Sequence, residues 1–273
     1  PLQPQLDKIT ALNDTAAITR YLRDSQAEGK GVLFSLFANA DYKDSANVIA
    51  YVGQGGLGLP EKGYYFDDAQ AKIRDAYVAY IAQVLTLSGV DAAQAAEQAK
   101  AVMAFETRLA KASMSRIEMR DPAKRYNPLS AAEADKLTPN FSWTALFETL
   151  KVPAAQKFSL AQPGFFGEMD KMLADVPAST WQAYLRFHTI DDASPYLSSQ
   201  FEKANIDFYG TTLRGQKEMQ PRWKRVLESV NGGMGEALGQ LYVDAVFPAE
   251  SKVAMQHLVA VSYTHLRAHE TPE

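Results

Sequence analysis

The sequence predicts a mainly α protein: one large helical domain with a small β-hairpin near its N-terminus. Three observations indicate this fold class. From Asp67 onward, apolar residues recur every three to four positions, which is the spacing of one helix face. Helix-capping residues and prolines fall between these periodic segments, where helices begin and end. Two short apolar runs, 32–37 and 48–52, flank a polar turn and are typical of paired strands.

The N-terminal part is predicted to hold a loop, a helix and the hairpin. Residues 1–12 are rich in Pro and Gln and are interpreted as a loop. A helix is expected to begin near Asn13 and to stop at Gly29, because glycine commonly follows the last helical residue. The polar residues 41–45 then form the turn that joins the two strands.

The rest of the chain is predicted to be a series of helices. Their expected first residues or caps are Asp67 or Asp68, Asp91, Ser130 with Glu133 as a capping box, and Ser142. The helix that begins at Asp67 or Asp68 is expected to end at Gly89. Later helices are predicted at 165–175, 178–188, 195–208, 217–230 and 234–247. Four large aromatic side chains at helical core positions are expected to be buried: Trp143, Trp181, Tyr184 and Trp223.

Composition excludes several classes of protein. The chain has 273 residues, of which 47% are hydrophobic and 22% charged, as in ordinary globular proteins. The net charge of −4 comes without a basic stripe, so no nucleic-acid partner is expected. No apolar run approaches the roughly 20 residues that span a bilayer. Because the sequence has no cysteine, disulfides, thiolate zinc sites and cysteine nucleophiles are excluded.

A glycine-rich segment follows the second predicted strand. Residues 53–58, GQGGLG, match the G-x-G-x-x-G pattern whose backbone amides approach a pyrophosphate at a helix N-terminus. Gly63 is a poor start for a crossover helix, and no alternating strand–helix pattern follows. The segment is therefore interpreted as a tight structural loop, with a dinucleotide site as the minority alternative. One or more of Gly55, Gly56 and Gly58 is expected to have a positive φ.

A histidine pair near the C-terminus is a candidate metal site. His265 and His269 are four residues apart, with Glu270 beside them, and could face one metal from a helix. A zincin motif needs glutamate directly after the first histidine, but that position is Leu266. No bound metal is expected in this chain, and the segment is interpreted as a disordered tail.

The remaining polar candidates suggest structure more than catalysis. His188 and His257 stand alone in helical patterns and are interpreted as surface or satisfied core residues. A charge-rich stretch is interpreted as an ion-pair network in preference to an acid–base pair. Its members are Glu106, Arg108, Arg116, Glu118, Arg120 and Asp121. The sequence contains no nucleophile elbow and no Walker loop.

A series of short motifs resembles one known family. Residues 56–65, GLGLPEKGYY, are similar to the G-L-P-x-x-x-Y-Y segment of the neprilysin family of zinc metallopeptidases. Other similar motifs are Glu106-x-Arg108-Leu109-Ala110, Arg120-Asp121-Pro122, Tyr126-Asn127, Asn140-Phe141-Ser142-Trp143, Phe208-Tyr209-Gly210, Arg222-Trp223-Lys224-Arg225, Gly239-Gln240-Leu241-Tyr242-Val243 and Phe247. Their order along the chain is that of the family, which makes the resemblance specific.

The resemblance implies the N-terminal, non-catalytic part of such an enzyme. In the family, two largely helical domains enclose a cavity that holds zinc and admits peptides. The zinc motif H-E-x-x-H and the later glutamate ligand lie C-terminal to every motif matched here, so no catalytic, cofactor-binding or metal residue is carried over. The implied function is the cavity-forming, substrate-enclosing part of a zinc metalloendopeptidase. Its implied partners are a peptide substrate and a missing C-terminal catalytic domain, and the chain alone is expected to be inactive.

The resemblance also sets the expected domain boundary and location. Residues 1–260 are interpreted as the family's helical domain and 261–273 as a tail foreign to it, because SYTHLRAHE at 262–270 resembles translated adapter sequence. The chain opens at Pro1 without Met or a signal peptide, so an upstream segment is expected. Family members act outside the cytoplasm, and the lack of cysteine favours a bacterial periplasmic or exported protein.

Two functions from other classes remain as alternatives. The first is a free-standing helical module that binds peptides or a partner protein. The second is a nucleotide-dependent enzyme that uses the glycine-rich segment. A downstream H-E-x-x-H in the natural gene would favour the peptidase, and measurable dinucleotide affinity would favour the nucleotide enzyme.

Overall fold

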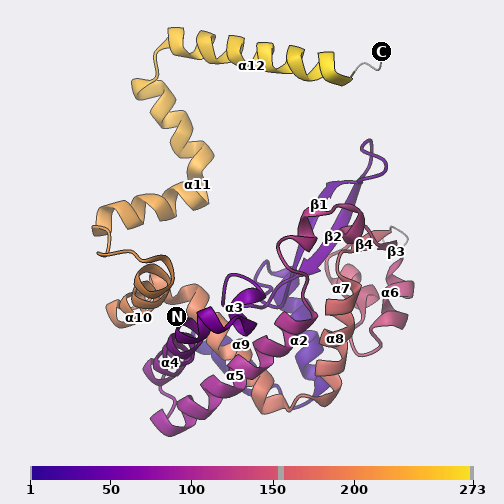
Figure 1. The fold of residues 1–273 in the computed structure, drawn as a ribbon, viewed down its shortest axis with the longest axis vertical. Helices are drawn as coiled ribbons and strands as arrows, with labels where there is room; N and C mark the ends of the chain where they lie inside the picture. Colours follow the sequence, from indigo (N-terminus) through magenta and orange to yellow (C-terminus); the bar gives the residue numbers. More distant parts are fainter. Residues whose placement is uncertain (1, 153–156, 271–273) are drawn as a thin grey trace. The chain divides into compact units, whose positions relative to one another are not determined.

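The computed structural model describes residues 2–152 and 157–270, the last five of them as backbone only. The chain divides into two compact units, and the boundary along the sequence lies between Lys217 and Glu218. Figure 1 shows the path of the chain from the N-terminal helices through the sheet to α12. Each unit is described by itself.

The N-terminal unit is mainly helical with one small sheet, which confirms the predicted fold class. Its helices are α1 (Gln3–Thr10), α2 (Thr15–Ala27), α3 (Gly63–Phe66), α4 (Ala71–Leu87), α5 (Ala92–Ala112), α6 (Ala131–Leu137), α7 (Trp143–Thr149), α8 (Pro163–Asp175), α9 (Ala178–Ala193) and α10 (Ser199–Asn205). A π-helical segment, Ile206–Thr212, continues α10. The second unit consists of α11 (Arg222–Val246) and α12 (Ala249–Glu270).

The sheet contains the predicted hairpin and two further strands. β1 (Phe34–Ala40) and β2 (Val48–Gln54) pair antiparallel from Phe34↔Gln54 to Ala40↔Val48. β4 (Phe158–Leu160) lies parallel to β2, and β3 (Pro128–Leu129) pairs antiparallel with β4, so the order is β1-β2-β4-β3. The sequence did not predict β3 and β4, because strands of two and three residues carry no readable alternation.

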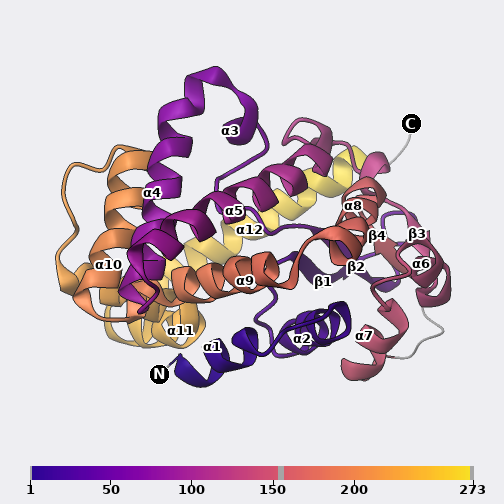
Figure 2. The same cartoon turned by 90° about the horizontal axis from the view of Figure 1, so that it is seen from below.

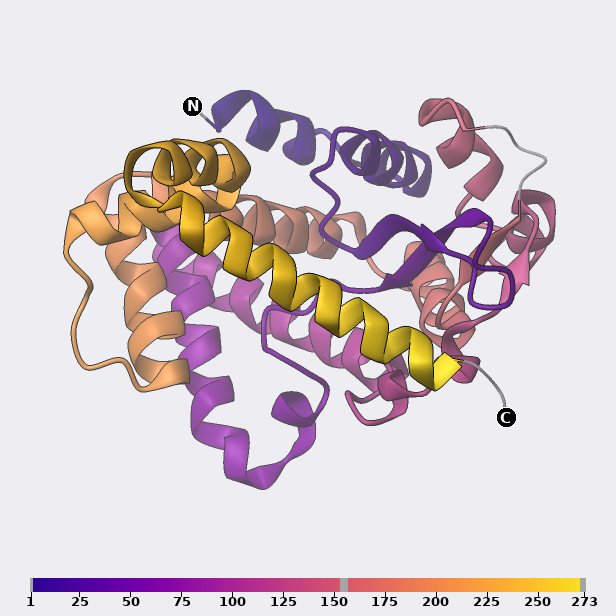
Figure 3. The same ribbon diagram turned by 90° about the horizontal axis from the view of Figure 1, so that it is seen from above.

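The centre of this unit is formed by α4, α5 and α9, which contact one another. Figures 2 and 3 show these helices from opposite sides. As predicted, Trp143, Trp181 and Tyr184 are fully buried. The prediction was wrong for Trp223, which lies on α11 and is 64% exposed, because no element of its own unit covers it.

Most predicted helix starts are confirmed by hydrogen bonds. The Asp91 carboxylate accepts from two backbone amides of α5, and the Ser142 hydroxyl accepts from one amide of α7. Ser130 and Glu133 form the predicted reciprocal capping box at α6. The prediction that Asp67 or Asp68 caps the next helix was wrong, because a 3-10 turn (Asp68–Gln70) lies between these residues and α4.

Two segments predicted to lack regular structure are helical. Residues 1–12 were expected to be a loop, but α1 occupies Gln3–Thr10 and buries Leu6 and Ile9, which lie three residues apart on one face. Proline at the start of this helix is tolerated because the first amides have no helical acceptor. The prediction of a disordered C-terminal tail was also wrong for the residues that the structure describes, because α12 continues to Glu270. Residues 271–273 lie outside the described residues.

The segment predicted as one helix at 195–208 is divided: it contains a 3-10 turn (Ser194–Tyr196), then α10, then the π-helical segment. The two helices expected at 217–230 and 234–247 are confirmed as the two halves of α11, which begins at Arg222 and breaks at Met234. Among the described residues, no helix has both the length and the apolar character needed to cross a membrane.

Candidate functional site

Glu106, on α5, is the centre of the most highly connected polar site in the N-terminal unit. Its side chain is fully buried and accepts from four donors. Oε2 accepts from the Gly58 amide at 3.0 Å and from the Tyr65 hydroxyl at 2.6 Å. Oε1 accepts from the Tyr77 hydroxyl at 2.9 Å and lies 2.9 Å from Nε2 of His188. One carboxylate thus joins α5 to α3, α4, α9 and the glycine-rich segment.

The hydrogen bond between Glu106 and His188 affects the pKa of the histidine. Burial lowers the pKa of His188, but its hydrogen bond to Glu106 and the carboxylate charge outweigh burial, so the pKa is raised overall. Burial, followed by the same charge, raises the pKa values of Tyr65 and Tyr77, which keeps both phenols protonated as donors. A carboxylate offers about four acceptor positions. All of them are engaged here, which makes Glu106 a structural anchor with no free position for a metal or substrate.

The glycine loop, residues 53–60, takes the tight conformation that the sequence predicts. Gly56 has a φ of 75°, which confirms the expected positive φ. Its carbonyl accepts from the Tyr184 hydroxyl at 2.9 Å. A Cβ at position 56 would lie 2.6 Å from that hydroxyl oxygen, and a Cβ at Gly58 would lie 1.8 Å from the Tyr77 hydroxyl oxygen. The loop therefore needs glycine for close packing as well as for backbone conformation.

The surroundings of the glycine loop do not resemble a dinucleotide site. The helix that follows it, α3, has only four residues, and its N-terminus carries no side-chain cap. The strand that lies parallel to β2 is β4, which comes about a hundred residues later in the chain. A dinucleotide-binding unit instead needs a strand, a glycine turn and a long crossover helix in direct succession.

A second buried carboxylate, Asp191 on α9, holds the π-helical segment. It accepts from the hydroxyls of Tyr80 and Tyr209, the latter at 2.8 Å, and from the Asn205 amide at 3.3 Å. Burial raises the pKa of Asp191. Tyr209 belongs to the Phe208-Tyr209-Gly210 motif, but no sequence pattern pointed to Tyr80, Asn205 or Asp191 as its partners. One available signal was that Asp191 lies three residues after His188 on one helix face.

Three shallow cavities in the N-terminal unit are lined in part by the glycine loop. The first, about 390 Å³, is lined by Leu57 and Gly58 of the loop together with His188, Asp192 and Arg214 among others. The second, about 290 Å³, includes residues of the loop and of 113–119, among them Met114 and Met119. The third, about 470 Å³, is lined by residues 57–60 with Tyr64, Tyr209, Leu213 and Arg214. The loop is therefore the wall between a polar cavity and a methionine-lined one.

The remaining members of the predicted charge network lie elsewhere. Arg108 pairs with Glu168 at 2.5 Å and Asp175 at 2.7 Å, which confirms the ion-pair interpretation for this residue. Glu118 and Asp121 accept from the nearby backbone amides of Ser115 and Ala123 and stabilise turns, whereas the Arg116 guanidinium donates to the Pro60 carbonyl at 3.3 Å. Glu106 is on the buried face of α5, so the structure does not bring it together with this group.

Histidines elsewhere form no metal site among the residues that the structure describes. In the described ranges, no group of three His, Asp or Glu side chains is arranged to hold an ion. His257 and His265 are exposed on α12, and the side chains of His269 and Glu270 lie outside the described residues. The absence of a bound metal stays a prediction. His188 is confirmed as a satisfied core residue by its contact with Glu106.

Comparison with known proteins gives one consistent family. A family model described as peptidase family M13 matches residues 1–261. Endothelin-converting enzyme 1 of Rattus norvegicus is 26% identical over 225 residues, which cover 80% of this chain and 30% of that protein. Membrane metallo-endopeptidase-like 1 of Homo sapiens is 28% identical over 243 residues, covering 84% of this chain and 31% of that protein. The chain thus spans less than a third of the length of these curated relatives.

Solved structures agree with the sequence comparison. The zinc metalloprotease Zmp1 of Mycobacterium tuberculosis, in an open state, superposes with a TM-score of 0.86 and 29% identity, covering 95% of this chain and 41% of Zmp1. PepO from Lactobacillus rhamnosis superposes with a TM-score of 0.84 at 20% identity, which is a likeness of fold alone.

Proposed function

Because the chain belongs to peptidase family M13 and is homologous to its zinc metalloendopeptidases, we propose that it is the N-terminal, cavity-forming and substrate-enclosing part of such an enzyme. The whole protein would cleave peptides. The observation that carries the proposal is the family match over residues 1–261 combined with coverage of only 30–41% of the relatives' length. A match of this extent corresponds to the N-terminal part of these relatives, which supports the enclosing role.

The second unit supports a role as one side of a larger assembly. None of the described side chains between 218 and 265 is buried. Large apolar side chains of α11 are exposed: Trp223, Val226, Leu227, Val230, Met234, Leu241, Tyr242, Val243 and Val246. Apolar surface of this extent is typical of interaction sites. The proposed partner is the C-terminal catalytic half, which would cover these helices in the complete enzyme.

Zinc would be held by that half. The described residues of this chain offer no three-ligand group, so they do not fit a zinc site, and no catalytic step is assigned to them. Their contribution would be a rigid wall, because the Glu106 site fixes the glycine loop to α4, α5 and α9 and so keeps the adjoining cavities in place.

The test is complementation. The purified chain should hydrolyse no peptide and retain no stoichiometric zinc after dialysis, because it has no H-E-x-x-H and no cysteine. Co-expression with the catalytic half of a complete relative should give a complex that contains zinc and cleaves peptides. One tightly held zinc per isolated chain would contradict the proposal and return attention to His265, His269 and Glu270.

A free-standing binding module remains the second candidate, favoured by the compact N-terminal unit. Sequencing the source gene beyond codon 260 separates the two, since only the peptidase needs a downstream H-E-x-x-H. The same experiment tests the proposal that 261–273 are foreign to the family, which the end of the family match at 261 supports. A natural stop after Glu273 would contradict that proposal.

We further propose an extracytoplasmic location, in a bacterial periplasm or exported, from family membership and the lack of cysteine. Fractionating the source cells, with an antibody raised against this chain, checks it. Recovery with the cytoplasmic fraction would contradict the proposal.

A further inference from the structure

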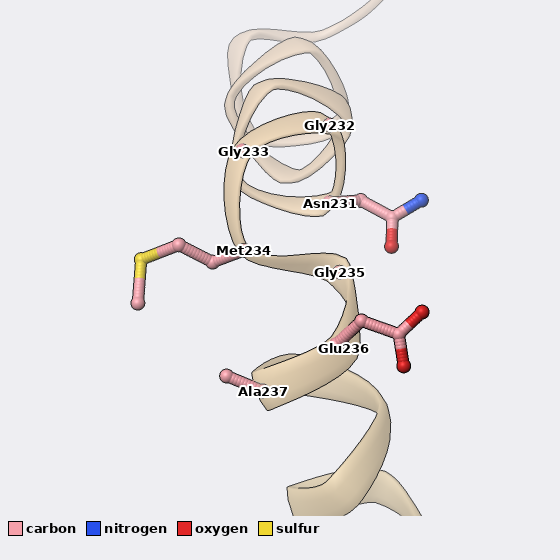
Figure 4. Close-up of a pocket in the computed structure, with 7 residues that line it drawn as sticks. All are labelled: Asn231, Gly232, Gly233, Met234, Gly235, Glu236 and Ala237. Carbon is pink, nitrogen blue, oxygen red and sulfur yellow. The ribbon is translucent and has the colours of Figure 1, made fainter. Parts of the chain in front are cut away.

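The helix α11 is interrupted at its centre. Met234 has a φ of −137° and a ψ of 27°, which lie outside the helical region, whereas the residues on either side continue as helix. Three glycines surround it, Gly232, Gly233 and Gly235 (Figure 4). Three glycines within four positions lower the stability of the helix locally, because glycine is the poorest helix former after proline.

These glycines are not required by the backbone or by packing in this unit. None of the three has a positive φ, unlike Gly56 in the glycine loop. A Cβ built at Gly232 or Gly233 meets no atom within 4 Å. At Gly235 the nearest atom is the side-chain oxygen of Asn231, at 3.3 Å. Alanine would fit at Gly232 and Gly233 and would strengthen the helix, so neither packing nor backbone conformation within this unit accounts for glycine there.

No core fixes the angle between the two halves of α11. No side chain described between 218 and 265 is buried, including those at the break. The hollow beside Met234 is lined by the consecutive residues 231–237 alone (Figure 4), so it is the space left by the break and not a pocket between elements.

We propose that residues 232–235 form a hinge between two rigid half-helices, 222–231 and 236–246. Each half keeps its own hydrogen-bonded turns, while the weakened backbone at 232–235 allows the angle between them to change. This inference concerns the second unit alone and does not depend on the proposed peptidase function.

The absence of native cysteine makes a direct distance measurement possible. Nitroxide labels would be placed on the full chain through Glu228→Cys and Asp244→Cys, two exposed positions on opposite sides of the break. Their distance distribution would be measured by pulsed electron paramagnetic resonance. A straight helix would separate these Cα atoms by about 24 Å, at about 1.5 Å per residue. The hinge predicts a broad distribution.

Matched controls isolate the hinge. Adding Gly232→Ala and Gly233→Ala should narrow the distribution and move it towards the straight-helix distance, whereas Gly239→Ala, a glycine with equally open surroundings in the second half, should leave it unchanged. A second pair within unbroken α12, Glu250→Cys and Thr264→Cys, gives the width of a rigid helix.

Two outcomes would overturn the hinge. The first is a 228–244 distribution in the parent chain as narrow as that of the α12 pair. The second is a broad distribution that persists when both alanines are present in a variant with unchanged helical circular dichroism. If the double variant fails to fold, the parent chain measured against the α12 pair still decides.

Discussion

Nε2 of His188 lies 2.9 Å from Oε1 of Glu106, with 9% of the His188 side chain and none of the Glu106 side chain exposed. Through this contact α9 is fixed to α5. The other oxygen of the same carboxylate holds the Gly58 amide, so the position of the glycine loop depends on the same buried group. Breaking a buried pair is costly because it leaves an uncompensated buried charge.

The substitution Glu106→Gln should destabilise the N-terminal unit by roughly 3 kcal/mol or more. An amide has one acceptor oxygen and adds a donor, so it cannot accept from Tyr65, Tyr77, His188 and the Gly58 amide together. The measurement is the free energy of unfolding in urea.

The control for this substitution is Glu97→Gln on the exposed face of the same helix. Among the residues that the structure describes, the ion-pair partner of Glu97 is Lys100, and both side chains are well exposed. Its loss should change the free energy of unfolding by less than about 0.5 kcal/mol. Equal effects of the two substitutions would show that Glu106 is not the anchor.

The contribution of His188 to stability should depend on pH. Its pKa is raised above the unfolded value of about 6.5. The native state therefore binds the proton more tightly, and this contribution is complete below about pH 6.5 and is lost as the pH rises through the folded pKa. His188→Gln removes the titrating group. The difference in unfolding free energy between parent and variant should shrink as the pH is raised from 6 to 9.

A constant difference over this range would contradict the raised pKa. Asp191 also has a raised pKa, but its unfolded value is about 3.9. The change in unfolding free energy that comes from Asp191 therefore begins at lower pH than the change that comes from His188.

Sequence reasoning located the hairpin, the caps of α5, α6 and α7, and the positive φ in the glycine loop because each depends on residues close together in the chain. It missed β4 because that strand is defined by pairing with β2, from Ala50↔Phe158 to Val52↔Leu160. No local pattern encodes a partner at that separation.

The role of Glu106 could have been read in part from the sequence. Val102, Glu106 and Leu109 follow each other at spacings of four and three, so a carboxylate stands within the apolar stripe of α5. The many charged residues that follow Glu106, from Arg108 to Asp121, instead favoured its interpretation as part of an ion-pair network. Its partners could not be identified in advance, because Tyr65, Tyr77 and His188 belong to three other helices.

Gly56→Ala should destabilise the chain by about 1 kcal/mol or more. Alanine is strained at a φ of 75°, and its Cβ would lie 2.6 Å from the Tyr184 hydroxyl oxygen. Gly164→Ala is the control, because Gly164 lies in α8 with no atom within 4 Å of an added Cβ and should be neutral or stabilising. A change near zero at Gly56 would contradict the tight-loop interpretation.

The last prediction concerns the exposed apolar side chains of the second unit. The isolated chain should bind a hydrophobic dye and self-associate, because exposed residues such as Trp223, Leu241 and Tyr242 are 64%, 66% and 61% accessible. Replacing Trp223 and Leu241 by Ser should lower both dye fluorescence and the associated fraction in sedimentation at little cost in stability, since neither side chain is buried. Co-expression with the catalytic half of a complete relative should suppress both properties of the parent chain. A parent chain that is monomeric, silent to the dye and cooperatively folded would remove the main physical consequence of the truncated-enzyme proposal and favour the free-standing binding module.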